Sequence, residues 1–337
     1  MESKSIRGKI GRLKHRLIII GQAVNNLELV DRAHNHFEVQ IFPNWDSSLI
    51  KNLRSPYSLW VHFDTTLRYQ DFDGNDLPEY LLTTTTGLTH IESELQTVLG
   101  DRLLHLATEK DFLKSITATA EHTWSLIMAI SNPWILKLNT EGNLGRAGLI
   151  RKNQLSSRKL GVIGYGRLGS LVSRYALAFG MEVYVHEKDP EVRIPSDSGL
   201  NSVSKVEELL QVCDIVTIHA SSRFPHNEIL SRSVLEHSRK GLSIINTSRG
   251  CLVDEEHVVE LLNKEIIDWY ATDTLKQEEV GGLSSPSELI ERGVNCNGVI
   301  LTPHIGGANI EAMHMCEENL FQRLNVALLE KNIKLED

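Results

Sequence analysis

The chain contains an arginine, a glutamate and a histidine that could together move a proton beside a bound anion. Arg249 follows residues 242–246, which are expected to form a buried strand, and His304 follows another such run at 299–301. Glu278 lies in the loop expected after the strand between these two. Ligands of open α/β sheets bind at the carboxyl ends of the strands. We therefore expect all three side chains at one edge of one sheet.

Each of the three residue types suits one role. A guanidinium binds a carboxylate through two parallel hydrogen bonds, so Arg249 could hold an acidic substrate. A neutral imidazole accepts a proton from a hydroxyl group and an imidazolium returns it, so His304 could be acid and base. A carboxylate beside an imidazole raises its pKa, which is the role expected of Glu278. A single arginine or one of fourteen histidines would more often be structural, so the prediction depends on the set.

A glycine-rich turn at Gly164–Gly169 indicates a binding site for a dinucleotide. The turn follows the apolar run 160–163 and precedes a stretch expected to be helical. Gly164 would permit the tight turn, Gly166 would let the backbone approach a pyrophosphate, and Gly169 would let helix and strand pack closely. The alternative is an ordinary strand, turn and helix that happens to contain glycines.

The expected cofactor is NAD. Its pyrophosphate would lie at the positive end of the helix, which begins near Arg167 and Leu168. Glu187 stands at the end of the next expected strand, 18 residues beyond the last glycine of the turn, close to the usual spacing of about 20. Its carboxylate could accept hydrogen bonds from ribose hydroxyls and would repel a 2′-phosphate, although Lys188 beside it weakens that exclusion. With the acid/base set, the turn predicts hydride transfer to or from a small 2-hydroxy acid.

Expected strands and helices alternate along most of the chain, which is typical of parallel sheets covered by helices. A length of 337 residues suits two domains. The strands expected in the N-terminal third are Leu17–Ile20, Phe37–Phe42, Leu59–Phe63, Tyr80–Thr83 and Leu103–Leu106. Six more are expected from residue 159 onward: Leu160–Ile163, Glu182–Val185, Asp214–His219, Leu242–Asn246, Trp269–Asp273 and Val299–Leu301. Six strands with helices between them would complete a doubly wound unit.

Composition and charge argue against several classes of partner. The net charge of -9 disfavours a general nucleic-acid-binding protein, because phosphate neutralisation needs a basic face. The apolar run Leu17–Ile20 is too short for a signal-peptide core or a membrane span. The basic residues at 3–16 are interpreted as a solvated tail rather than an import signal or interaction arm. Four scattered cysteines fit neither a disulfide framework nor a zinc site, so we expect no metal and a cytoplasmic protein with reduced thiols.

From about Thr83 onward the chain resembles the NAD-dependent D-2-hydroxyacid dehydrogenases. Besides the glycine turn and the Arg249 segment, Asp273 and Glu278 have the five-residue spacing of the family. Four further segments are similar to family motifs: Thr86-Gly87-Leu88-Thr89-His90-Ile91, Ala120-Glu121-His122-Thr123, Cys213-Asp214-Ile215-Val216-Thr217-Ile218-His219 and Thr302-Pro303-His304-Ile305-Gly306-Gly307.

The resemblance implies a role for each candidate residue. Arg249 would bind the substrate carboxylate and keto oxygen, His304 would be the acid/base, and Glu278 would orient and charge it. Backbone amides around Thr86 and Gly87 would hold the substrate carboxylate. The cofactor-binding residues that it implies are Gly164, Gly166, Arg167, Leu168, Gly169, Glu187, His219, Thr247, Asp273 and Gly306.

The resemblance also implies an architecture. A Rossmann NAD-binding domain at residues 119–307 would be inserted into a flavodoxin-like, doubly wound substrate domain formed by residues 1–118 and 308–337, with the active site in the cleft between them. The family is usually dimeric, so a homodimer with residues 120–130 near its interface is expected. No regulatory domain is seen after the last helix, which would make this a short form.

Two other functions stay open at this point. Oxidation of another small anion would use the same fold, but formate dehydrogenases carry glutamine where Glu278 stands, which disfavours formate. An NAD(H)-sensing binding protein, similar to the C-terminal-binding-protein corepressors, would keep all three residues but show negligible turnover. The loop Phe63-Asp64-Thr65-Thr66, which should reach the substrate, lacks basic residues, so an unphosphorylated acid is favoured.

Overall fold

The computed structural model describes residues 15–51, 56–72, 77–132, 154–220, 228–276, 278–279, 282–283 and 287–334. The chain divides into two compact units, each of which is described by itself. The first unit is Met1–Leu113 with Met313–Asp337, and the second is Lys114–Ala312. The division falls five residues from each domain boundary expected from the sequence.

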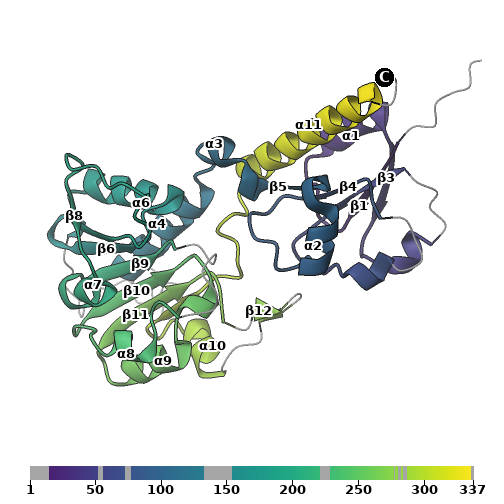
Figure 1. Ribbon diagram of the computed structural model, residues 1–337. Coiled ribbons are helices and arrows are strands. Elements are labelled where there is room, and N and C mark those ends of the chain that lie inside the picture. The colour runs from purple at the N-terminus through teal and green to yellow at the C-terminus, as the bar shows by residue number, and fades with distance from the viewer. Residues whose placement is uncertain are drawn as a thin grey trace, which may run out of the picture. The chain divides into compact units, whose positions relative to one another are not determined.

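The first unit is built on a parallel sheet with the strand order β2-β1-β3-β4-β5 in the described residues (Figure 1). This is the flavodoxin-like order, in which the chain reverses direction across the sheet beside its first strand. Its strands are β1 (Arg16–Ile20), β2 (Glu38–Phe42), β3 (Tyr57–Val61), β4 (Tyr80–Thr83) and β5 (Leu103–His105). Its helices are α1 (Leu27–His36), α2 (Ser93–Leu99), α3 (Lys110–Leu113) and most of α11 (Ile310–Lys334).

Helices cover both faces of this sheet, as expected for strands that are continuously apolar. Leu95 and Leu99 of α2 pack in one core with Leu59 and Leu81 of the sheet, while α1 and α11 lie together on the other face (Figure 1). The buried carboxylate of Glu317 in α11 accepts the backbone N–H groups before α1 at 2.9 Å each. It thereby satisfies donors that a helix start leaves unpaired, and ties the C-terminal helix to the N-terminal one.

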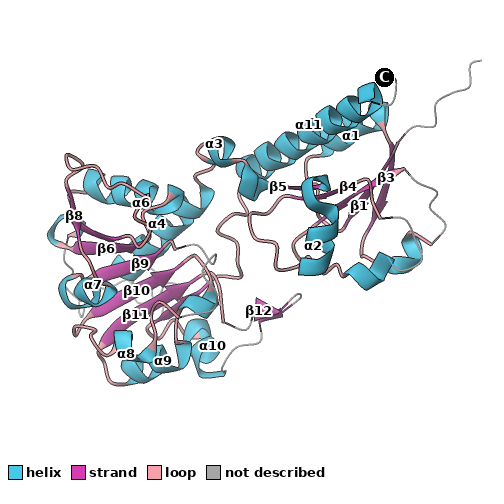
Figure 2. Ribbon diagram, viewed as in Figure 1, coloured by secondary structure: helices cyan, strands magenta, loops and turns pink. Residues whose placement is uncertain are grey.

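The second unit is built on a parallel sheet with the strand order β14-β11-β10-β9-β6-β7-β8 in the part of the chain described (Figure 2). This is the dinucleotide-binding order, which reverses beside β6. Its strands are β6 (Lys159–Ile163), β7 (Glu182–His186), β8 (Leu200–Ser202), β9 (Ile215–Ile218), β10 (Leu242–Asn246), β11 (Ile267–Thr272) and β14 (Val299–Leu301), with a separate hairpin of β12 (Glu278–Glu279) and β13 (Gly282–Leu283). Its helices are α4 (Ala118–Ser131), α6 (Arg167–Ala178), α7 (Val206–Val212), α8 (Arg232–Leu235), α9 (Glu255–Asn263) and α10 (Ser287–Val294).

Two cores lie on opposite faces of this second sheet. Successive strand residues point to opposite faces, so Ile244 packs in the core beneath α7, α9 and α10, whereas Ile245 packs in the core beneath α4 and α6. The α/β class with two doubly wound sheets is therefore confirmed. The six strands expected from residue 159 onward all lie in this sheet, but its seventh strand, β8, was not expected because this three-residue edge strand, Leu-Asn-Ser, carries no apolar run. The short β12–β13 hairpin was not expected either.

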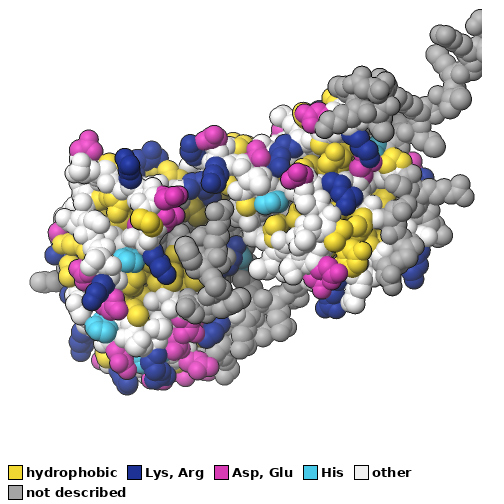
Figure 3. All heavy atoms as spheres, in the orientation of Figure 1, with side chains coloured by type: hydrophobic (Ala, Val, Ile, Leu, Met, Phe, Trp, Pro, Cys, Tyr) yellow, Lys and Arg dark blue, Asp and Glu magenta, His cyan; other side chains and the backbone are white. Residues whose placement is uncertain are grey.

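The distribution of charged side chains on the surface is typical of a globular protein. Acidic and basic side chains are interspersed on the face seen in Figure 3. No helix within the described ranges is long and apolar enough to cross a membrane.

A buried carboxyl group at the start of α9 is unusual in this core. Asp254 caps α9 by accepting the His257 N–H at 3.0 Å, and the next residue, Glu255, is 1% exposed. Both oxygens of Glu255 lie 3.3 Å from the Lys276 backbone N–H. Burial raises the pKa of Glu255 to about 7, and the amide of Lys276 only partly opposes this. The proton therefore stays on the folded chain to near neutral pH.

This carboxyl group predicts a loss of stability as the pH rises. Below about pH 4.5 both folded and unfolded chains hold the proton. Between pH 4.5 and 7 the unfolded carboxyl ionises first, so the free energy of unfolding falls, by up to about 3 kcal/mol at pH 8. Glu255→Gln removes the titration, so its stability relative to wild type should improve by about 2–3 kcal/mol between pH 5 and pH 8, as measured by urea unfolding.

The exposed neighbour Glu256 provides a matched control. Glu256→Gln should leave the wild-type pH dependence in place. An equal stability difference between Glu255→Gln and wild type at both pH values would contradict the prediction.

Candidate active site

Four loops of the second unit follow the carboxyl ends of strands in one sheet. The glycine turn follows β6, the Arg249 turn follows β10, Asp273 begins the loop after β11, and the His304 loop follows β14. Strands β10, β11 and β14 are neighbours, and β9 separates β10 from β6. Because all the strands are parallel, these loops share one edge of the sheet.

The first and last glycines of the turn are closely packed, whereas the middle glycine is open. Gly164 has a φ of +91°, and a Cβ there would lie 2.8 Å from the backbone nitrogen of Ala220. A Cβ on Gly169 would lie 1.9 Å from the carbonyl oxygen of Gly164. A Cβ on Gly166, in contrast, would meet nothing within 4 Å. This open backbone at the start of α6 fits the pyrophosphate of a dinucleotide.

The carboxylate of Glu187 lies directly at the glycine turn. Its two oxygens accept the backbone N–H of Tyr165 at 2.6 Å and that of Asp189 at 2.8 Å. The carboxylate is thus held where β7 ends, with lone pairs remaining on both oxygens. The guanidinium of Arg167, also in the turn, donates to the carbonyl oxygen of Ile116.

His219 packs beneath the same turn at the end of β9. Its backbone N–H donates to the Ile163 carbonyl at 2.7 Å, and its ring nitrogen Nε2 lies 3.0 Å from the Thr217 hydroxyl. Burial lowers the pKa of His219 to about 3, so the ring is neutral. Its Nδ1 is buried without a hydrogen-bond partner among the described residues, which suits a residue beside a cofactor rather than one that titrates.

Hydrogen bonds and a close backbone approach fix the turn that carries Arg249. The Asn246 side chain donates to the Arg249 carbonyl at 3.0 Å and accepts the Ser248 N–H at 3.0 Å. The hydroxyl of Thr247 lies 2.8 Å from that of Thr123 in α4. Gly250 crosses the loop after β11 so closely that a Cβ would lie 2.0 Å from the Leu275 carbonyl carbon. The Arg249 turn therefore has little freedom to move.

The Arg249 guanidinium is half-buried and only partly engaged. Its Nη1 donates to the Ser248 carbonyl at 2.7 Å. In the part of the chain that the structure describes, its Nε and Nη2 have no other partner, so they can bind an anion.

The loop that carries His304 is held by the carboxylate of Asp273. One oxygen accepts the Thr302 hydroxyl at 2.5 Å and the Ile305 N–H at 2.9 Å, and the other accepts the Gly306 N–H at 2.7 Å. Asp273 is 2% exposed. Burial alone would raise its pKa, but the hydrogen bonds from His122, Thr302 and the two amides outweigh burial and lower the pKa below its usual value. Asp273 is therefore ionised and fixes the residues on both sides of His304.

Glu278 lies in β12, in the hairpin after β11. Its side chain lies outside the described part of the chain, so its expected position beside His304 stays a prediction.

Thr86 and Gly87 belong to the first unit, in the loop after β4. The Thr85 hydroxyl donates to the Gly87 carbonyl at 2.7 Å and so shapes the loop. Neither the Thr86 nor the Gly87 backbone N–H donates to another residue within the described ranges. Unpaired amides in a loop can bind an anion, as expected for a substrate carboxylate.

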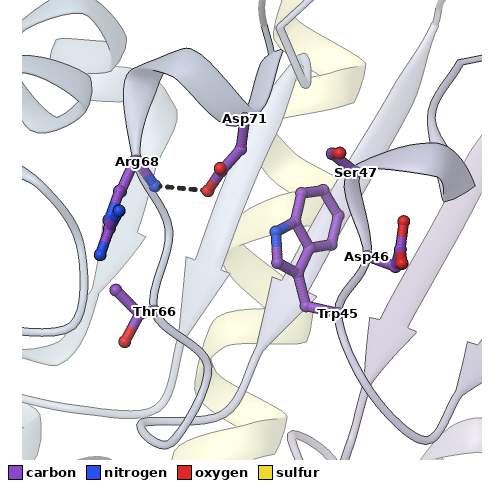
Figure 4. Close-up of a pocket in the computed structure, with 6 residues that line it drawn as sticks. All are labelled: Trp45, Asp46, Ser47, Thr66, Arg68 and Asp71. Carbon is purple, nitrogen blue, oxygen red and sulfur yellow. Dashed lines mark hydrogen bonds between the residues drawn. The ribbon is translucent and has the colours of Figure 1, made fainter.

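An open pocket of about 300 Å³ lies in the first unit, in the loops after β2 and β3 (Figure 4). Its lining residues are Trp45, Asp46, Ser47, Thr66, Arg68 and Asp71. The Arg68 backbone N–H donates to the Asp71 carboxylate at 2.8 Å. None of the site residues predicted from the sequence lines it. No group of three or more His, Cys, Asp or Glu side chains is placed to hold a metal ion within the described residues.

Some of the side chains that hold the site together were not among the residues predicted from the sequence. Asn246 ends an expected strand, and Thr302 and His122 lie in segments similar to family motifs, but none of the three was assigned a role. The contact between His122 and Thr302 joins residues 180 positions apart. A single sequence carries no signal for such a pairing.

Comparison with known proteins agrees with this geometry. Residues 134–306, just over half of the chain, match the family model described as D-isomer specific 2-hydroxyacid dehydrogenase, NAD binding domain. The D-3-phosphoglycerate dehydrogenase of Haemophilus influenzae is 32% identical over 160 residues, which cover 48% of this chain and 38% of that protein. The match thus spans little more than a third of that relative. The glyoxylate reductase of Aeropyrum pernix is 28% identical over 247 residues, covering 69% of this chain and 70% of the relative.

A solved structure shares the fold. The D-lactate dehydrogenase of Aquifex aeolicus, crystallised with NAD and lactic acid, matches with a TM-score of 0.73 at 21% identity, covering 95% of this chain and 97% of that one. The glycine turn, the strand order of the second sheet and the family match together lead to one assignment. The chain belongs to the D-isomer specific 2-hydroxyacid dehydrogenase family, and its second unit contains the NAD-binding domain of that family.

Proposed function

We propose that the protein interconverts a D-2-hydroxy acid and its 2-oxo acid, with NAD as the hydride carrier. One observation carries the proposal: the turns bearing Arg249 and His304 lie at the same sheet edge as an open glycine turn. An anion-binding group, a proton-transfer group and a dinucleotide site are the parts that this reaction needs. When bound at the glycine turn, NAD would supply or accept the hydride at C2 of the acid.

The imidazole of His304 would move the proton. In the oxidation direction the neutral ring accepts the proton of the C2 hydroxyl as the C–H bond breaks. In the reduction direction the imidazolium returns that proton to the carbonyl oxygen. Glu278 would lie beside the ring and stabilise its charged form.

The substrate carboxylate would be bound by Arg249. A guanidinium can donate two parallel hydrogen bonds to a carboxylate or bridge a carboxylate and a keto oxygen. The available Nε and Nη2 groups of Arg249 support this role. The unpaired amides of Thr86 and Gly87 would supply further donors from the first unit.

The first unit favours a substrate without a phosphate group. After β3, the ring of His62 stacks on Phe63 with centroids 4.1 Å apart, and its Nδ1 lies 2.9 Å from the Asp64 carboxylate. The family resemblance implies that this loop reaches the substrate, where its exposed carboxylate would repel a phosphorylated acid. We therefore expect a 2-oxo acid with an uncharged side chain to be preferred.

The direct test is NADH consumption by the purified protein against a panel of 2-oxo acids. The panel runs from glyoxylate and pyruvate to branched, aromatic, hydroxylated and phosphorylated acids. We expect turnover on one unphosphorylated class. His304→Gln should lower kcat by about 10²- to 10⁴-fold because the proton donor is lost, and Arg249→Ala should lower kcat/KM by about 100-fold because a charged hydrogen-bond pair is lost.

Two exposed residues of the same unit are the controls for these substitutions. Arg232→Ala removes a surface ion pair with Glu260, and His237→Gln removes an exposed ring. Both should keep wild-type turnover. NADH binding without turnover on any acid would overturn the enzyme proposal and favour an NAD(H)-sensing protein.

The position of Glu187 predicts a preference for NADH over NADPH. Its carboxylate would face the 2′-phosphate of NADPH at the glycine turn, where like charges repel. Glu187→Gln should reduce the ratio of the two kcat/KM values by about tenfold. The exposed Glu191 on the following segment is the control, and Glu191→Gln should leave the ratio unchanged. Equal use of both cofactors by the wild type would contradict the assignment of Glu187.

We also propose that the protein is a homodimer that buries part of α4. Met128 on α4 is 40% exposed, and Phe179 is 47% exposed while its ring stacks 4.8 Å from that of Trp124. These apolar side chains on one face suit burial against a second copy. Sedimentation should give twice the chain mass of 37.9 kDa. Phe179→Glu should weaken the dimer at least about tenfold, and a monomeric wild type would contradict the proposal.

A further inference from the structure

The first turns of α4 contact two of the loops that carry candidate site residues. The hydroxyl of Thr123 lies 2.8 Å from that of Thr247, two residues before Arg249. Its neighbour His122 places Nε2 3.0 Å from the Thr302 hydroxyl and 3.3 Å from an Asp273 oxygen. One turn of helix therefore supports both the anion-binding turn and the loop that carries His304.

The direction of the hydrogen bonds around Thr302 follows from the number of protons. The Thr302 hydroxyl has one proton, and its closest partner is the Asp273 carboxylate at 2.5 Å. Asp273 is ionised, because its pKa is lowered by the donors around it despite burial, and an ionised carboxylate can only accept. The Thr302 proton therefore points to Asp273, and His122 Nε2 must carry the proton that it shares with Thr302.

His304 needs such support because its backbone is strained. Its φ is +53°, in the left-handed region that residues other than glycine rarely adopt. Its N–H donates to the Thr302 carbonyl at 3.0 Å, which closes a three-residue turn around Pro303. A conformation of this kind is unfavourable and persists only where neighbouring contacts enforce it.

The ring of His122 also closes the space around this loop. A Cβ on Gly306 would lie 2.8 Å from Asp273 Oδ2 and 3.3 Å from His122 Cδ2. The carboxylate, the imidazole and the loop backbone are therefore packed without a gap. Removing the ring would leave Thr302 and Asp273 without a donor from α4.

We propose that His122 is a positioning residue for His304. By donating its Nε2–H to Thr302 and to the Asp273 carboxylate, it fixes residues 302–306 in the strained conformation that presents the His304 imidazole to a substrate. The proposal rests on the acid/base role proposed above for His304. His122 itself touches neither substrate nor cofactor in this scheme.

Three variants of the full-length protein separate the donor from the ring. His122→Leu keeps bulk but removes the donor, whereas His122→Gln can place an amide N–H near the position of Nε2. His237→Leu removes an exposed histidine of the same unit as a control. Thermal unfolding of each variant shows that it is folded before kinetics are measured.

The kinetic readout is the split between kcat and KM for the preferred 2-oxo acid. We expect His122→Leu to lower kcat about 10- to 100-fold, since a small displacement of an acid/base group costs that much. The KM values for NADH and the acid should stay within about threefold, because no binding group is removed. His122→Gln should restore most of the lost kcat, and His237→Leu should behave as wild type.

Hydrogen exchange provides a readout that does not depend on activity. The Ile305 and Gly306 amides both donate to Asp273, so their peptide should exchange slowly in the wild type. His122→Leu should speed exchange of that peptide about tenfold, and His122→Gln should largely reverse the change. If no acid is turned over by the wild type, the proposed function fails, while this exchange still decides whether His122 holds the loop.

Three results would overturn the positioning proposal. The first is unchanged exchange at Ile305 and Gly306 in His122→Leu. The second is faster exchange with wild-type kcat, which would mean that catalysis does not need the fixed loop. The third is an equal loss of kcat in the Leu and Gln variants, which would mean that the donor is irrelevant.

A double-mutant cycle with Thr302→Val tests the route of the effect. That substitution removes the hydroxyl without altering α4. It therefore tests the same hydrogen bond even if His122→Leu fails to fold. If His122 acts through Thr302, the combined loss of kcat should be smaller than the product of the two single losses. Independent, multiplicative losses would show that His122 acts elsewhere and would overturn the proposed route.

Discussion

The carboxylate of Asp273 is the interaction on which the carboxyl edge of the second sheet depends. A buried carboxylate is tolerated only when hydrogen bonds replace the water that it loses. Here both oxygens accept donors from residues 302–306, and α4 adds the His122 imidazole. These donors keep Asp273 ionised, and the same hydrogen bonds fix the loop backbone on both sides of His304. Glu278 is only five residues beyond Asp273, so the hairpin that contains it begins shortly after this buried carboxylate.

The remaining site loops are fixed by contacts between loops rather than by the strands that precede them. Gly250 passes so close to Leu275 that only glycine fits, which joins the Arg249 turn to the loop after β11. The buried carboxyl group of Glu255 accepts the backbone N–H of Lys276, the residue after Leu275. The strands determine that the loops lie at the carboxyl edge of the sheet. The contacts between loops determine the position of each side chain at that edge. A substitution at one loop should therefore disturb its neighbours, since the groups share partners.

The two units provide different chemistry. The second combines an open glycine turn, a half-engaged guanidinium and a fixed backbone around His304, which suit a cofactor, an anion and a proton. The first contains the unpaired amides of Thr86 and Gly87 in the loop after β4 and the exposed carboxylate of Asp64 after β3. Glu317 of α11 stabilises the start of α1, so the C-terminal helix belongs to the first unit although the second unit intervenes in the sequence.

Local sequence alone determined most of the fold and was enough to name the candidate reactive residues. Apolar runs of four or five residues identify most strands, and the glycine turn, Arg249 and His304 are recognisable because each motif is contained in a few consecutive residues. The edge strand β8 was missed because Leu-Asn-Ser has no apolar run. Only the tertiary structure assigned partners to Asn246, His122 and Thr302. Hydrogen bonds require atoms within about 3 Å in space, and no local pattern specifies which residue, 180 positions away, will supply the other atom.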